Sequence, residues 1–565
     1  MPTPRLGLFL RGSSYAYQDE IIGGVHQECR ARGVNLLCLA GGNIAVADPR
    51  NFVYALPSAV DLDAAIIVSG TLAADDGDPG VRGLLERLHP MPVLTIGARE
   101  PGFPSVTVDN SAGVRALTRH LIEVHGRKRI AFIAGHGREA ERRFMGYRLA
   151  HRDCGLAFDQ GLLVPGDFER PSGLRAVSAL FDRGRGCDAI VAANDWMALG
   201  AIEALGVRGL SVPEDVSVVG FDDVDEARFA APPLTTVRQV PRQLGVEAVR
   251  AVVAVASGEA EIGDRVLQTL PQIRQSCGCF RGERRAFDPG ARAAPRWHDT
   301  KLWAAATAAS GPAQDPSLPT DWPQQMASSL RSDLEAGKGV RFLATVDTIV
   351  RKAAEVGNVS TWHQPVAALR REAVRDLGQE KTKLVLAESL FERAHLLIGD
   401  HAERVQGRRR LEAEETFRAL GEMARDVLAS LDRAAIGRAL ALHLPKLRVS
   451  SAAVVVHGSG QPVESDGEAR LVIAWDCERG LRTFEGGVAF RAGLLLPEAF
   501  RPARRHTLMV QPLCLGSETL GWCLLEMDPP RAVVCEEIPT PLVAAIAATA
   551  LRETLAATSL ALRRQ

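Results

Sequence analysis

From Leu6 to about Asp223 the sequence alternates short apolar runs with longer amphipathic stretches, and this alternation constrains the fold most strongly. The runs are rich in β-branched or aliphatic residues, which is typical of strands buried on both faces. Strand–helix alternation predicts right-handed βαβ units and parallel sheets, and the number of units favours two Rossmann-like lobes over one sheet. The expected strands are Leu6–Leu10, Val34–Leu39, Ala64–Ser69, Val93–Gly97, Arg129–Ala134, Asp188–Ala193 and Val216–Phe221.

Periodicity and composition divide the chain into four parts. We expect a two-lobed α/β module over residues 1–283, followed over 284–320 by a linker rich in Ala, Pro, Gly and Arg. Helical spacing of apolar residues predicts a helical signalling region over 321–430. Residues 431–565 return to strands and end in an amphipathic helix from about Pro541, which predicts an α+β domain.

The overall charge balance argues against a general attraction to nucleic acid or membranes. The formal net charge is -1, and 24% of residues are charged, so no single-sign field surrounds the protein. Leu6–Leu10 is too short for a secretory apolar region, and the apolar stretch Leu542–Leu551 is followed at once by Arg552 and Glu553. We therefore expect a cytoplasmic protein that does not enter a membrane.

The ten cysteines are scattered, and only Cys277 and Cys279 lie close together. In a cytoplasmic chain such thiols are expected to stay reduced. Two thiols alone do not supply the four ligands of a structural zinc site. The sequence therefore predicts neither a metal nor a cofactor.

Polar and aromatic residues follow the first expected strand. Open α/β sheets bind ligands outside the carboxyl ends of their strands. The loop there contains Ser14, Tyr15 and Tyr17, which include two of the four tyrosines in the chain. An aromatic ring with a polar tip suits stacking on a sugar or a base, although a loop tyrosine can also simply cover core residues.

Further polar residues follow later strands. Later strand ends place Asp109, Asn194 and Asp222, and Arg143 begins a helical pattern after the strand that ends near Gly135. A guanidinium can clamp a carboxylate or vicinal oxygens. Asp and Asn also serve as helix N-caps, so both roles stay open for these positions.

Several ordered motifs resemble the lactose/galactose-repressor family. They are Val108–Gly113, His120–Gly126, Arg143–Tyr147, Asp188–Gly200, Val216–Asp223 and Pro232–Gln239. The resemblance covers about half of the chain. It implies two lobes joined by three crossovers, one near Gln239, which close on a small effector. It also implies effector contacts by Arg143, Asn194 and Asp222, with Phe221 lining the pocket and Asp109 and the Ser14–Tyr17 loop contributing.

The chain also departs from the pattern of a repressor. A member of that family carries a helix-turn-helix before the sensor, whereas the first expected strand here begins at Leu6. Direct DNA binding is therefore not expected. Ile273–Cys279 resembles the junction of a sensor subgroup that is fused to signalling outputs, and residues 431–565 resemble a GAF domain.

No enzyme motif accompanies the expected cleft. The chain has no phosphate-binding P-loop, zinc-protease motif or nucleophile elbow. We expect a sensor of a sugar-like molecule, or of a nucleobase, whose lobe closure regulates a signalling or transcriptional output. The alternative is a transcription regulator that reaches DNA through a partner protein or an unrecognised site.

The last helix is expected to mediate association with a second copy of the chain or with a signalling partner. Its apolar side would carry Leu542, Ile546, Leu551, Leu555 and Leu562.

Overall fold

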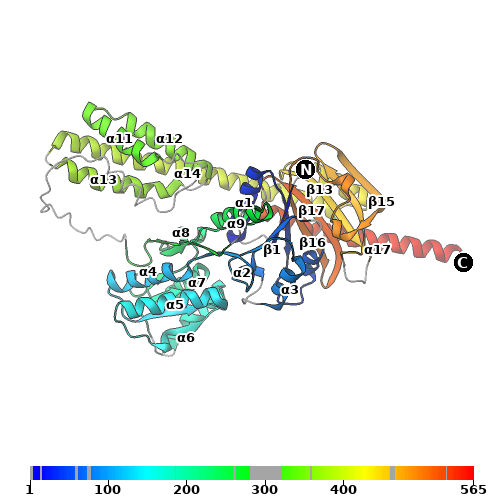
Figure 1. The fold of residues 1–565 in the computed structure, drawn as a ribbon, viewed down its shortest axis with the longest axis horizontal. Helices are drawn as coiled ribbons and strands as arrows, with labels where there is room; N and C mark the ends of the chain where they lie inside the picture. The colour runs from blue at the N-terminus through cyan, green and yellow to red at the C-terminus, as the bar shows by residue number, and fades with distance from the viewer. Residues whose placement is uncertain are drawn as a thin grey trace. The chain divides into compact units, whose positions relative to one another are not determined.

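The computed structural model describes residues 4–12, 16–57, 62–72, 78–182, 184, 186–258, 263–279, 321–356, 359–378, 380–458, 465–529 and 531–564. The chain forms two compact units (Figure 1). One unit combines Met1–Arg281 with Thr416–Gln565, and the other is Gly282–Glu415. The linker predicted over 284–320 lies outside the described residues.

Lobe 1 is a doubly wound parallel sheet, as the alternating pattern predicts. Its strand order is β11-β5-β4-β3-β1-β2. Helices α1 (Ala16–Arg32) and α9 (Pro241–Ala256) pack against each other on one face, and α3 (Pro79–Leu88) packs on the other. The strands are β1 (Arg5–Arg11), β2 (Asn35–Gly41), β3 (Ala64–Ile67), β4 (Val93–Ile96), β5 (Ser105–Val108) and β11 (Arg265–Leu267).

Lobe 2 is a second parallel sheet, in the order β7-β6-β8-β9. The chain passes between the lobes three times: after β5, after β10 (Thr236–Arg238), and between β11 and β12 (Leu270–Gln272). The strands are β6 (Ile130–Ala134), β7 (Leu163–Pro165), β8 (Ala189–Ala192) and β9 (Ser217–Val219). The helices are α4 (Asn110–Glu123), α5 (Gly137–Asp153), α6 (Arg170–Asp182), α7 (Asp195–Val207) and α8 (Asp225–Phe229). The return of α9 to lobe 1 places a crossover at Gln239, as expected.

The second unit is helical. It contains α11 (Trp322–Ala336), α12 (Arg341–Val356), α13 (His363–Leu377) and the first part of α14 (Lys381–Leu428). Phe342 and Phe391 meet edge to face in its core. Arg408–Arg410 are exposed on α14, where Arg410 pairs with Glu414 at 2.9 Å. This arrangement fits the solvated face of a long helix.

Residues from α15 (Arg433–His443) onward form an antiparallel sheet with flanking helices. The strand order is β16-β17-β13-β14-β15, and α16 (Ala532–Glu537) and α17 (Pro539–Arg564) follow. The strands are β13 (Val449–His457), β14 (Glu468–Asp476), β15 (Gly480–Arg491), β16 (Thr507–Leu515) and β17 (Glu518–Met527). This is the α+β class that the pattern predicts, while the GAF-like resemblance stays a prediction.

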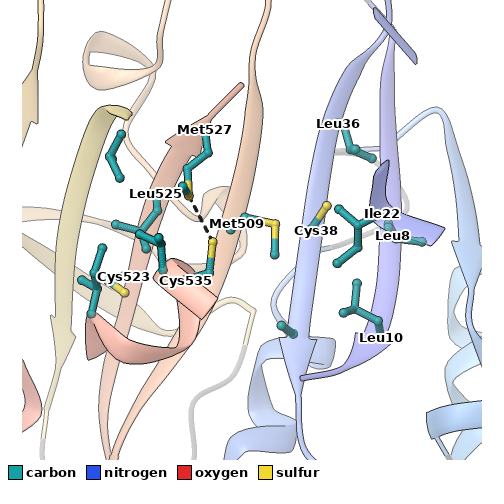
Figure 2. Close-up of a cluster of buried hydrophobic side chains, with 14 of the residues drawn as sticks. Leu8, Leu10, Ile22, Leu36, Cys38, Met509, Cys523, Leu525, Met527 and Cys535 are labelled. Atoms are coloured by element: carbon teal, nitrogen blue, oxygen red, sulfur yellow. Dashed lines mark hydrogen bonds between the residues drawn. The ribbon is translucent and has the colours of Figure 1, made fainter. Parts of the chain in front are cut away.

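The C-terminal sheet continues the sheet of lobe 1. Strand β16 pairs in parallel with β2, with Thr507–Val510 beside Leu36–Leu39, so that one sheet of 11 strands results. Met509 on β16 is paired with Cys38 on the neighbouring strand β2, and both side chains belong to the same apolar core (Figure 2). An edge strand carries unpaired backbone groups that another strand can satisfy, and β16 does this for β2.

The beginning of α17 packs on its own sheet. Leu542 and Val543 are buried and Ile546 is partly buried, whereas Leu551 and Leu555 are exposed. The expectation that Leu542 and Ile546 face a partner is therefore wrong, because the sheet covers them. The side chain of Leu562 lies outside the described residues.

One segment, Val533–Ala556, is long and apolar enough to cross a membrane by length and composition, contrary to the sequence-based expectation. Half of it is buried within the fold. A core helix of a folded domain has the same character, so this observation is weak evidence for a membrane span.

Candidate ligand-binding cleft

Arg143 is the centre of the candidate site. This α5 residue is 3% exposed, and its guanidinium lies over the Phe221 ring, 3.9 Å from the ring centroid. Its Nε donates to Asn110 Oδ1 at 2.9 Å, and its Nη1 donates to the Ala193 carbonyl at 2.7 Å. A buried charge needs such partners, and together they lock the orientation of the guanidinium.

Asp222 lies beside Arg143 at the carboxyl end of β9. Its Oδ1 is 3.6 Å from Arg143 Nη1 and accepts a hydrogen bond from Gln239 Nε2 at 2.7 Å. Burial raises the pKa of Asp222 to about 6, against the opposing effects of Arg143 and Gln239. The carboxylate is therefore ionised at pH 7 but close to its titration range.

The backbone at Asp222 and Asp223 is left-handed, with φ values of 121° and 62°. Residues other than glycine adopt such angles rarely and at a cost of about 1–3 kcal/mol, and they cluster at functional sites. The Asp222 amide donates to the Val237 carbonyl at 2.8 Å, which ties this strained turn to a hinge strand.

Two neighbouring carboxyl groups stabilise the turn. Asp195 is fully buried and accepts from the Thr236 hydroxyl at 2.5 Å and from the Val224 amide at 3.0 Å. Burial and the nearby Asp222 raise the pKa of Asp195 well above its ordinary value. Asp223 pairs with three guanidinium groups, which belong to Arg228, Arg238 and Arg274.

Lobe 1 contributes Tyr17 to the opposite side of the cleft. Burial, with Glu139 and Asp222 nearby, raises the pKa of the Tyr17 hydroxyl, so the hydroxyl stays protonated and can donate a hydrogen bond. Glu139 of lobe 2 approaches lobe 1 at Gly97, where an added Cβ would lie 3.9 Å from Glu139 Oε1. Ser14 and Tyr15 lie outside the described residues.

Asn194 and Asp109 act as helix caps. Asn194 Oδ1 accepts from the Met197 amide at 3.0 Å, and its Nδ2 donates to the Phe168 carbonyl at 2.8 Å. Asp109 Oδ1 accepts from the amides of Ser111 and Ala112. Both side chains thus take the capping role that the sequence left open, at the edge of the site.

Two amide side chains complete the site: Asn110, which follows Asp109 at a predicted strand end, and Gln239, which was predicted only to lie near a crossover. Asn110 binds Arg143 through its oxygen, and Gln239 binds Asp222 through its nitrogen. Among the described residues, the Asn110 Nδ2 and the Gln239 Oε1 are buried and have no hydrogen-bond partner. A buried unpaired polar atom costs about 1–3 kcal/mol, so one donor and one acceptor here are available to a ligand.

Phe168 is a further residue that the sequence did not indicate. Its ring centroid lies 5.9 Å from the Arg143 guanidinium, and its ring meets His136 edge to face. Gly135 leaves room for it, because an added Cβ would lie 2.2 Å from the Phe168 ring. Phe168 has a φ of 67° and follows a short edge strand, and no sequence pattern signals such a position.

A separate cavity of about 280 Å³ lies on the C-terminal sheet, between β14 and the loop that contains Phe500. Its acidic group, Asp476, is already bound by Arg504 Nη2 at 3.1 Å. Asp476 is thus already paired, whereas Asn110 Nδ2 and Gln239 Oε1 at the candidate site have no partner among the described residues.

The two parallel sheets and the three crossovers define a two-lobed periplasmic-binding-protein-like module. A family model described as "Periplasmic binding protein-like domain" matches residues 118–277. CelR of Thermobifida fusca, an HTH-type transcriptional regulator, is 37% identical over 225 residues, which are 37% of this chain and 66% of CelR. The HTH-type transcriptional repressor PurR of Haemophilus influenzae is 31% identical over 252 residues, which are 44% of this chain and 72% of PurR.

Because PurR is 31% identical and is matched over 72% of its own length, the chain belongs to the LacI family of transcriptional regulators. A solved CelR–cellobiose complex is similar over 49% of this chain and 86% of that one, with 31% identity and a TM-score of 0.43. These relatives are regulators rather than enzymes.

Proposed function

We propose that the cleft between the lobes binds a sugar-like effector and that lobe closure on it regulates a transcriptional or signalling output. The observation that carries the proposal is the pair formed by the buried Arg143 and the partly buried Asp222, flanked by Asn110 Nδ2 and Gln239 Oε1, which have no partner among the described residues. This set offers a carboxylate acceptor, an amide acceptor and an amide donor at one place.

A polyol fits this set well. Each sugar hydroxyl donates one hydrogen bond and accepts others, so neighbouring hydroxyls can satisfy Asp222, Gln239 and Asn110 together. The rings of Tyr17, Phe168 and Phe221 add apolar surface for the faces of a sugar ring. A nucleobase would use similar groups and is the second class to test.

Ligand binding would bring the two lobes together because residues of both lobes form the site. Tyr17 belongs to lobe 1, whereas Arg143 and Asp222 belong to lobe 2. A ligand that contacts both sides binds the closed form better and shifts the population toward it. Lobe 1 shares its sheet with the C-terminal strands, so the closure can be passed to them. We further propose that the protein acts in the cytoplasm, as a homodimer.

A thermal-shift screen tests the ligand class. We expect a saccharide such as cellobiose to raise the melting temperature of the wild-type chain and to have little effect on Asp222→Asn. Asparagine preserves the shape and tolerates the left-handed backbone, so this variant should fold. The matched control is Asp182→Asn, which makes the same change at an exposed ion pair with Arg208 in the same lobe.

Equal stabilisation of the wild type and Asp222→Asn would contradict the assigned cleft. Stabilisation by adenine or guanine alone would replace the sugar with a purine. Whether this chain itself contacts DNA is a separate question, which a DNA-binding measurement at low salt answers, because phosphate contacts are strongest there.

A further inference from the structure

Four potential metal ligands meet at one point in lobe 2, outside the effector cleft. His120 lies in the last turn of α4, and His125 follows just after that helix. Cys277 and Cys279 follow β12, where the chain leaves the lobe. The ligand atoms of the four side chains all lie within 4.8 Å of one another.

The distances match the edges of a zinc tetrahedron. His120 Nε2 and His125 Nε2 are 3.2 Å apart, and Cys279 Sγ lies 3.5 Å and 3.4 Å from them. With Zn–N bonds of about 2.0–2.1 Å and Zn–S bonds of about 2.3 Å, the expected edges are about 3.3 Å between nitrogens and about 3.6 Å between nitrogen and sulfur. The three observed separations agree with these values.

The backbone of the cysteine segment is held in place before any ion binds. The Ser276 hydroxyl donates to the Val218 carbonyl at 2.6 Å and accepts from the Thr235 amide at 2.8 Å. The Ser217 hydroxyl donates to the Cys277 carbonyl at 2.9 Å. The segment is therefore fastened to lobe 2 by hydrogen bonds from neighbouring strands.

Gly278 allows both thiols to approach the imidazoles. Its φ is 114°, which other residues rarely adopt, and an added Cβ would lie 3.0 Å from His125 Nδ1.

We propose that His120, His125, Cys277 and Cys279 bind one Zn²⁺ ion as a closed structural site. Two histidines and two cysteines complete the tetrahedron and leave no open position for a substrate. On binding, the two thiols release their protons to solvent and coordinate as thiolates. The sequence showed only the cysteine pair, and the fold supplies the two missing ligands from the end of α4.

The ion would hold Cys277–Cys279, where the chain leaves the ligand-binding module, against the end of α4, the first helix of lobe 2. Without it, only hydrogen bonds and packing hold Cys277–Cys279 there. With it, the point where the chain leaves the module would move as one body with lobe 2. This proposal is independent of the identity of the effector.

Metal analysis of the full chain, purified without chelator and dialysed, tests the site. We expect about one zinc per chain in the wild type and less than about a tenth of that in the double variant Cys277→Ser, Cys279→Ser. Cys187→Ser is the matched control, because Cys187 is a buried thiol of the same lobe that is not one of the four proposed ligands. It should retain the wild-type zinc content.

A second measurement does not depend on how well the variants fold. Co²⁺ added to the metal-depleted wild-type chain should give the strong visible absorption of a tetrahedral site together with thiolate-to-metal charge transfer. Three results would overturn the proposal: substoichiometric zinc with no tetrahedral Co²⁺ spectrum, equal zinc loss in Cys187→Ser, or a Cys277–Cys279 disulfide in the purified chain.

Discussion

The residues of the cleft divide into those that hold the turn and those that face the ligand. Burial alone would raise the pKa of Asp223, but Arg238, Arg274 and Arg228 lower it below its ordinary value, which makes Asp223 a structural anchor. Among the described residues, Asp222, one position earlier, accepts a side-chain hydrogen bond from Gln239 and lies 3.6 Å from Arg143. Neighbouring aspartates thus serve different purposes because their partners differ.

Effector binding should weaken as the pH falls through about 6. Burial raises the pKa of Asp222 to about 6, and ligand hydroxyls donate to its ionised form. Calorimetric titration with the best saccharide from the screen, at pH 7.5, 6.5 and 5.5, should show this fall in the wild type, approaching about tenfold per pH unit below the pKa. Unchanged affinity at pH 5.5 would contradict a contact with ionised Asp222.

The stability of the unliganded chain should change in the opposite direction. A raised pKa means that the folded state binds the proton more tightly than the unfolded state. The contribution of Asp222 to stability is therefore present at low pH and is lost as the pH rises through about 6. Chemical denaturation should show that lowering the pH from 7 to 5 stabilises the wild type relative to Asp222→Asn.

At the scale of elements, the pairing of β2 with β16 joins segments from opposite ends of the chain. Asp528, just after β17, contacts His26 at 2.9 Å and Arg30 at 2.5 Å on α1. The apolar core runs through both parts, with Leu8 and Leu36 on one side and Leu525 and Met527 on the other (Figure 2). Lobe 1 and the C-terminal sheet should therefore unfold as one cooperative unit.

Substitution of Leu525 by alanine tests this cooperativity. The loss of a buried leucine costs about 2–5 kcal/mol, and we expect it to weaken hydrogen-exchange protection in β1 as much as in β17. Leu205→Ala, in the separate core of lobe 2, is the control and should leave β17 unaffected. Loss of protection in β17 with no change in β1 would show that the two parts are independent.

The sequence predicted the elements better than their long-range arrangement. Buried parallel strands are recognisable because their apolar runs are local. Arg143 and Asp222 were predicted because they follow such runs, whereas Phe221 was predicted only from the family resemblance. The β2–β16 pairing was not predictable, since β2 is an ordinary buried strand whose partner lies far along the chain. The roles of Asn110 and Gln239 became visible only when the fold showed which of their atoms lack partners among the described residues.

At the scale of the whole molecule, association with a second copy is the simplest role for the exposed part of α17. Leu551 and Leu555 are 62% and 61% exposed and lie one helical turn apart. They lie on the side of the helix opposite Leu542 and Ile546, which pack on its own sheet. Burial of this surface against the same helix of another chain would remove it from water.

Glutamate at both positions should shift the chain from dimer to monomer. Sedimentation velocity of Leu551→Glu, Leu555→Glu should show a decrease in mass, because two buried charges oppose association. Leu515→Glu is the control, since Leu515 is exposed at the end of β16. A dimer that persists in the double variant would place the interface elsewhere.

The central claim is that an effector binds between the lobes, and hydrogen exchange with and without the best compound from the screen tests it most directly. We predict protection on both sides of the cleft, at the start of α1 around Tyr17 in lobe 1 and at Arg143 and Phe221–Asp222 in lobe 2. Protection confined to one lobe, or to the β14 cavity near Phe500, would contradict it.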